Sequence, residues 1–279
     1  MRHLFLSVVA LAFFVAPARA ETYDIPLDMS GTRPAVSVSI NGGAPELWVF
    51  DTGAGGTVMD IAKARALGLP EEQPVQLGSP AGGTPQQGFL TTLSSLNVAG
   101  HTLPPTHVVA APAIMADRGG VLSPFAFNGQ FVTFDFAHSR VRISDRTPAN
   151  TPAGMPTPYG GTGRGHQLPA ITVTLGAQTW MAHIDTGSPG AVTFPYAMAA
   201  TLPLAAPPVQ TGRARFVDGD HARYSATLTG RIHVGPLTLD NPQIELIDGL
   251  PSINIGSRLL NQMTITLDPE AQRVWAVSN

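Results

Sequence analysis

Two aspartates, each followed by Thr-Gly, are the residues of this chain most suited to chemistry. "LWVFDTGAGG" (47–56) leads an apolar run into Asp51, and "MAHIDTGSPG" (181–190) leads another into Asp185. One such motif is typical of a plain strand-end turn, in which Asp caps the turn and Gly supplies a positive φ angle. Two copies in matched surroundings favour a shared role for the two acids.

Two carboxylates in contact cannot readily both ionise, so such a pair holds one proton over a wide pH range. The ionised member can deprotonate a water, and the protonated member can polarise a substrate carbonyl. This chemistry hydrolyses an amide without a covalent intermediate, a metal or a cofactor. The residues expected to support the pair by hydrogen bonding or close backbone approach are Thr52, Gly53, Thr186 and Gly187.

The segments around the two motifs resemble each other along their length. "RPAVSVSINGGAPELWVFDTG" aligns with "LPAITVTLGAQTWMAHIDTG", and each alternates like a β-hairpin. The half ends also align, since Asp135 and Asp268 lie 133 residues apart, as do Arg140 and Arg273. The sequence therefore predicts a tandem duplication: a signal peptide (1–20), one lobe (21–147), a linker (148–164) and a second lobe (165–279).

Helix is scarce, and further hairpins are expected beyond each motif. Asp60 is expected to cap a helix over 61–68, and Pro195 to open the equivalent segment 196–202. Segments 76–90 and 213–226 are typical of hairpins that could cover a cleft. Their candidate substrate-binding residues are Gly82, Gly83, Asp218, Gly219 and Tyr224, although Tyr224 could equally be a packing residue.

With these parts in order, the chain resembles a two-lobed aspartic protease of the pepsin/retropepsin type, closest to small bacterial exported members. The resemblance covers nearly the whole mature chain. It implies an all-β fold of two homologous β-barrel lobes, related by a pseudo-twofold with the cleft between them. It implies an aspartic endopeptidase in which Asp51 and Asp185 are the catalytic dyad.

Two positions depart from the family pattern. Ser188 occupies the position of a hydroxyl that, in the family, bonds the carboxylate and favours its ionised form, but the first half has Ala54. We therefore expect Asp185 to ionise more readily, and a pH optimum less acidic than that of pepsin. The first half also has Ser123 where Gly256 stands in the second, a change that either distorts or repacks that half.

Composition limits the partners. Residues 1–20 have a basic start, an apolar run and a small-x-small end, which predicts an exported protein, periplasmic or secreted, without a membrane anchor after cleavage. The remaining chain carries 14 basic and 19 acidic residues and no basic stripe, which argues against nucleic acid. Cysteine is absent, so no thiol nucleophile or disulfide is available. We expect a monomer acting on a peptide or protein substrate.

Other candidates are weaker. His101 and His107 lack tight metal-ligand spacing, so no metal is assigned, and His183 is expected to be a structural histidine rather than a proton-sharing neighbour of Asp185. Asp135 and Asp268 are interpreted as turn formers, and "GGTGRG" (160–165) lacks the Lys-Ser/Thr ending of a phosphate loop. Two alternatives stay open: an inactive relative that binds peptides or a partner protein in the same cleft, and a structural envelope module.

Overall fold

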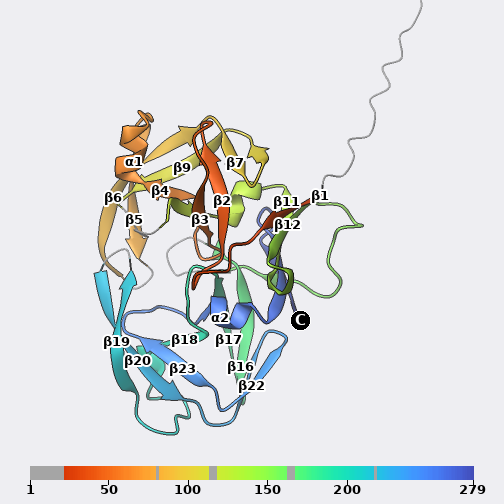
Figure 1. The fold of residues 1–279 in the computed structure, drawn as a ribbon. Helices are drawn as coiled ribbons and strands as arrows, with labels where there is room; N and C mark the ends of the chain where they lie inside the picture. The colour runs from red at the N-terminus through yellow and green to blue at the C-terminus, as the bar shows by residue number, and fades with distance from the viewer. Residues whose placement is uncertain (1–21, 80–81, 113–117, 162–166, 217–218) are drawn as a thin grey trace, which may run out of the picture.

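The computed structural model describes residues 22–79, 82–112, 118–161, 167–216 and 219–279 (Figure 1). The predicted signal peptide lies outside these residues. The chain is mostly β, as predicted, and its strands form two similar nine-stranded mixed sheets, a six-stranded sheet and a short two-stranded one. No helix within the described ranges is long and apolar enough to cross a membrane.

The first nine-stranded sheet has the order β5-β6-β9-β4-β10-β3-β2-β7-β8. Its strands are β2 (Ala35–Ile40), β3 (Glu46–Phe50), β4 (Val58–Asp60), β5 (Gln73–Ser79), β6 (Gly82–Leu93), β7 (Leu96–Val98), β8 (His101–Leu103), β9 (Thr106–Ala111) and β10 (Gly120–Leu122). β2 and β3 are the two strands of the first predicted hairpin.

The second sheet repeats this order strand for strand, as β19-β20-β23-β18-β24-β17-β16-β21-β22. Its strands are β16 (Ala170–Leu175), β17 (Gln178–Asp185), β18 (Val192–Pro195), β19 (Val209–Phe216), β20 (Gly219–Thr227), β21 (Arg231–Val234), β22 (Leu237–Asp240), β23 (Gln243–Ile247) and β24 (Asn254–Gly256). β16 and β17 form the second predicted hairpin, so the two sheets are the bodies of two lobes.

Both halves of the chain contribute to the six-stranded sheet. Its order is β1 (Thr22–Pro26), β12 (Arg140–Asp145), β11 (Gln130–Asp135), β25 (Met263–Asp268), β26 (Arg273–Ser278) and β13 (Thr157–Pro158). β11 and β25 pair antiparallel, and Thr133 lies opposite Thr266 with their hydroxyls 2.9 Å apart. These two threonines are 133 residues apart, so equivalent residues of the two halves face each other, as a twofold relation requires.

The predicted linker region contributes structure of its own. β13 pairs with β26, and β14 (Gly160–Gly161) pairs with β15 (Gln167–Leu168). Residues 162–165 of "GGTGRG" lie outside the described part of the chain.

The few helices are short. α1 (Ile61–Ala66) begins after Asp60, whose carboxylate accepts from the Lys63 amide as the predicted N-cap, and Gly68 follows it with a positive φ. The segment opened by Pro195 is a 3-10 turn, η3 (Tyr196–Met198), rather than an α-helix. Three further short helices were not expected from the sequence: the 3-10 helices η1 (Pro124–Phe127) and η2 (Phe136–His138), and the α-helix α2 (Ser257–Leu260).

Burial explains the two sequence patterns of the hairpin strands. β2 alternates because one face lies on the core, where Val36, Val38 and Ile40 are buried. β3 and β17 instead lie in the middle of their sheets, and their last residues before the motif, such as Phe50 and Ile184, are completely buried. Each Asp-Thr-Gly motif therefore follows a strand whose last residues are buried in the middle of its sheet.

Candidate active site

Each aspartate lies where a central strand meets a parallel neighbour. β10 pairs parallel with β3, placing Leu122 beside Phe50, and the Asp51 amide donates to the Leu122 carbonyl at 2.9 Å. β24 pairs in the same way with β17, placing Gly256 beside Asp185. Both aspartates are half-buried, so they keep some contact with solvent.

The two Asp-Thr-Gly turns are joined by a reciprocal set of hydrogen bonds between Thr52 and Thr186, both fully buried. Each threonine amide donates to the other threonine's hydroxyl at 3.0 Å. Thr52 Oγ1 then donates to the Ile184 carbonyl at 2.8 Å, and Thr186 Oγ1 donates to the Phe50 carbonyl at 2.6 Å. The predicted bonding across the junction is therefore present, and it ties the two strand ends together.

The two motif glycines allow the carboxyls to approach. A Cβ on Gly53 would lie 2.8 Å from Asp185 Cγ, and one on Gly187 would lie 2.4 Å from Asp51 Oδ2. Neither glycine has a positive φ, so the requirement is close packing rather than backbone conformation. Each glycine therefore lies against the acid of the opposite lobe.

Asp51 receives two backbone donors on one oxygen. The Gly53 amide donates to Asp51 Oδ1 at 2.7 Å, and the Gly187 amide from the second lobe donates to the same atom at 3.2 Å. Burial foremost, and then the negative charge of Asp185, raise the pKa of Asp51 to about 8. Both effects favour the protonated form of Asp51.

Asp185 has a side-chain donor that sequence analysis missed. Asn254 Nδ2 donates to Asp185 Oδ2 at 2.6 Å, whereas no described hydrogen bond joins the Ser188 hydroxyl to this carboxyl. Val121 occupies the place of Asn254 in the first lobe, because Val121 lies opposite Val49 as Asn254 lies opposite His183. The sequence feature that could have indicated this donor is the polar Asn254 at a position where the first copy has the apolar Val121.

Ser123 is accommodated in the first lobe by a different set of contacts. In the second lobe the Ser257 amide donates to the Ser188 carbonyl at 2.8 Å. The first lobe has Pro124 at the place of Ser257, which has no amide hydrogen. Ser123 Oγ supplies the donor instead, to the Ala54 carbonyl at 2.7 Å.

The His183 ring has two polar contacts with neighbouring residues. Its Nδ1 lies 3.0 Å from Ser252 Oγ, and the ring also bonds the Gly160 backbone. Burial lowers its pKa, so the ring is neutral near pH 7. These contacts agree with the structural role expected for it.

The remaining polar candidates lie in ordinary surroundings. His101 stacks on Tyr23 with ring centroids 3.7 Å apart, and His107 Nδ1 lies 3.0 Å from Thr92 Oγ1. Asp135 pairs with Arg140 beside its hairpin turn, and Asp268 accepts from the Ala271 amide in the equivalent turn. Both are turn residues, as interpreted from the sequence.

The two predicted cleft hairpins are formed by β5–β6 and β19–β20, and in the view of Figure 1 both run toward the boundary between the lobes. Gly82 and Gly83 begin β6, and Gly219 begins β20 with φ 137°. Asp218 lies outside the described residues. Tyr224 packs against Tyr196, with ring centroids 4.2 Å apart and the ring planes tilted by 30°.

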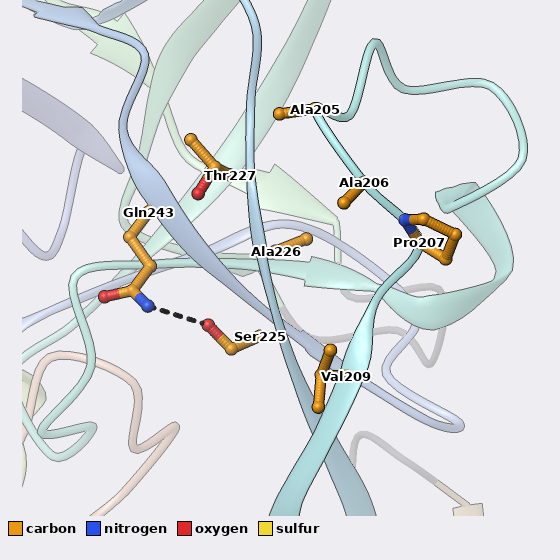
Figure 2. A pocket seen from close by; sticks show the side chains of 8 residues that line it. All are labelled: Ala205, Ala206, Pro207, Val209, Ser225, Ala226, Thr227 and Gln243. Atoms are coloured by element: carbon orange, nitrogen blue, oxygen red, sulfur yellow. Dashed lines mark hydrogen bonds between the residues drawn. The ribbon is translucent and has the colours of Figure 1, made fainter.

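A hollow at the base of the second hairpin is a different feature (Figure 2). Its lining contains neither aspartate, and the polar contact across it is Gln243 Nε2 to Ser225 Oγ at 3.1 Å. The lining residues are Ala205, Ala206, Pro207, Val209, Ser225, Ala226, Thr227 and Gln243. Within the described ranges, no three His, Asp or Glu side chains gather as metal ligands would.

Part of the chain matches a known protein family. Residues 36–124, from β2 to the start of η1, match the family model described as Aspartyl protease. An aspartyl protease family domain therefore occupies the first lobe and includes Asp51. No curated protein matches the chain significantly.

Proposed function

We propose that the chain is an aspartic endopeptidase whose two lobes each supply one catalytic acid, Asp51 and Asp185. The observation that carries the proposal is the packing of each motif glycine against the opposite acid, which makes the two turns one site. The family match of residues 36–124 supports the same reaction class. The strand order of the second lobe, identical to that of the first, supports a pseudo-dimer built within one chain.

The protonation of the pair sets the proposed roles. The ionised Asp185 accepts a proton from a water held between the acids, as that water's oxygen attacks the carbonyl carbon of a peptide bond. Asp51 gives its proton to the carbonyl oxygen, which forms a neutral gem-diol. When the C–N bond breaks, the leaving nitrogen takes the proton from Asp185, and a diol hydroxyl returns one to Asp51. No covalent intermediate with the protein forms.

The rival proposal, a non-catalytic protein that binds peptides in the same place, rested on Ala54 and Ser123. The hydrogen bond from Ser123 to Ala54 removes one of these reasons, because the change preserves a contact of the active-site turn. Both acids, both threonines and both glycines are present. Hydrolysis therefore has the stronger support.

The test is peptide cleavage by three proteins prepared in parallel: the wild type, Asp51→Asn and Asp185→Asn. Each is incubated with a mixed peptide library between pH 3 and pH 8, and new termini are identified by mass spectrometry. We expect cleavage by the wild type and its loss in both variants, since each acid has a separate proton to move.

Folded wild type that cleaves nothing at any pH, yet binds library peptides, would establish the rival. Cleavage that survives either substitution would place the chemistry elsewhere. Gly55→Ala is a matched control because a Cβ there meets nothing within 4 Å. It is expected to cleave like the wild type.

Export is part of the proposal and is supported by residues 1–20 alone. Expression of the full chain in a bacterial host tests it. N-terminal sequencing of the exported fraction is expected to begin at Glu21. Protein that stays uncleaved in the cytoplasm would contradict this part and leave the assignment of the acids untouched.

A further inference from the structure

We propose that Asn254 is a positioning residue that decides which acid of the pair is ionised, by holding Asp185 as the carboxylate. The inference rests on the proposed function and adds a residue to its machinery. It assigns the difference between the two acids to one amide on β24, and not to the residue that follows each Asp-Thr-Gly motif.

The contact is short and comes from a fixed part of the fold. Asn254 Nδ2 lies 2.6 Å from Asp185 Oδ2, on a strand whose next residues, Ile255 and Gly256, pair with Ile184 and Asp185. Parallel pairing on one side and antiparallel pairing with β18 on the other hold the β24 backbone in place. The amide is therefore presented to Asp185 by the sheet.

The other polar atom of the Asn254 amide, Oδ1, supports the same role. Asn254 Oδ1 is buried and has no hydrogen-bond partner among the described residues. A side chain kept only for structure would be expected to satisfy both ends of its amide. Turning the amide over would direct Oδ1 at Asp185 Oδ2, and two acceptors would then repel. The donor orientation is the one that an ionised Asp185 selects.

The first lobe has no equivalent donor. Val121, at the matching position, is 5% exposed and apolar. The described donors to Asp51 are the amides of Gly53 and Gly187, both at Oδ1. These two amides favour an ionised Asp51, and Asn254 opposes them as a side-chain donor to Asp185. A hydrogen bond to a charged group is worth more than one between neutral groups, so this donor shifts the pair toward an ionised Asp185.

The other charges near Asp185 do not explain the bias. Asp51 faces it from the first lobe, and Arg33 reaches across to donate from Nε to the Gly187 carbonyl at 2.5 Å. His183 lies on the same strand, and its lowered pKa keeps it neutral near pH 7. The strands packed on β17, namely β14, β16 and β24, contain no ionisable side chain. A substitution of Asn254 leaves the charged residues Asp51 and Arg33 in place, so a change in the titration of the pair can be attributed to the lost amide.

The first test is the pH dependence of kcat/KM for Asn254→Val, which copies the first lobe. Loss of one hydrogen bond to a carboxylate is expected to move the acidic limb upward by roughly 1–2 pH units. KM at the optimum should change little, because the proposed role of Asn254 is to contact Asp185 and not the substrate. An acidic limb that coincides with that of the wild type would overturn the proposal.

Adding Val121→Asn to Asn254→Val gives the matched control. The donor then lies beside Asp51, so the acids exchange roles and the acidic limb is expected to return toward its wild-type position. A double variant that keeps the shifted limb would assign the effect to packing of β24 and contradict the proposal.

A readout independent of cleavage separates this inference from the proposed function. Carboxyl ¹³C signals of aspartate-labelled protein are titrated, and Asp51→Asn and Asp185→Asn assign the signals of the pair. We expect the lower of the pair's two titration steps to move upward in Asn254→Val, even if the protein cleaves no peptide. If the wild type cleaves peptides but the step does not move in Asn254→Val, the role of Asn254 is refuted and the proposed function is not.

Discussion

Ser123 Oγ donates a hydrogen bond to the Ala54 carbonyl at 2.7 Å. This bond replaces the one that the Ser257 amide donates to the Ser188 carbonyl in the second lobe. Ser123→Gly removes this donor, and Pro124 cannot replace it. We expect a loss of about 1–2 kcal/mol in the free energy of unfolding, measured by urea denaturation. We also expect lower kcat, since the bond holds the turn after Asp51.

Two further variants test the compensation. Ser123→Gly combined with Pro124→Ser rebuilds the second lobe's arrangement and should recover part of the loss. Gly256→Ser should be far more damaging, because its Cβ would lie 2.4 Å from the Gly190 carbonyl oxygen. Equal effects of Ser123→Gly and Gly256→Ser would contradict this account.

Thr52→Val is expected to lower the free energy of unfolding by about 2–4 kcal/mol, because it leaves the Thr186 amide and the Ile184 carbonyl unpaired in a buried site. Thr91→Val is the matched control. Thr91 is also fully buried, but its hydroxyl has no partner among the described residues, so removing it should be neutral or stabilising. Similar losses for both variants would show that the bonds across the lobes contribute nothing special.

Gly187→Ala is expected to reduce kcat by about 100-fold or more, because its Cβ would push Asp51 away from Asp185 by a fraction of an ångström or more. Gly53→Ala should act in the same direction through Asp185. Steady-state kinetics with one cleaved peptide measures both. Retained activity in either alanine variant would mean that the two acids need not approach closely.

The fold and the placement of the two aspartates at strand ends follow from the sequence because both depend on local repetition. Alternating hydrophobicity marks β2 and β16, and the repeated motif marks the ends of β3 and β17. Asp60 and Gly68 likewise mark the two ends of α1 by ordinary capping chemistry. Such signals lie within a few residues of the element that they specify.

The supporting contacts of the site could not be predicted in this way. The sequence placed the difference between the acids at Ala54 and Ser188, whereas the described donor to Asp185 is Asn254, 69 residues further along the chain. Likewise, the departure of Ser123 from the family pattern is explained by its hydrogen bond to the Ala54 carbonyl, which the next residue, Pro124, has no amide hydrogen to make. These contacts depend on which strands become neighbours, and a single sequence does not give that pairing.

Asp51 also predicts how stability depends on pH. Its pKa is raised in the folded protein from the ordinary 3.8 to about 8, so between these values the folded state binds more protons than the unfolded state. Stability is therefore greatest below about pH 4 for this group and falls as pH rises, by at most about 1.4 kcal/mol per pH unit. His183 acts with the opposite sign, because burial lowers its pKa and the folded protein resists its protonation. Comparing urea unfolding of Asp51→Asn with the wild type from pH 4 to pH 8 isolates Asp51. We expect the variant to lose this downward slope and to be the more stable protein at pH 8, and parallel curves would show that Asp51 carries no extra proton in the folded state.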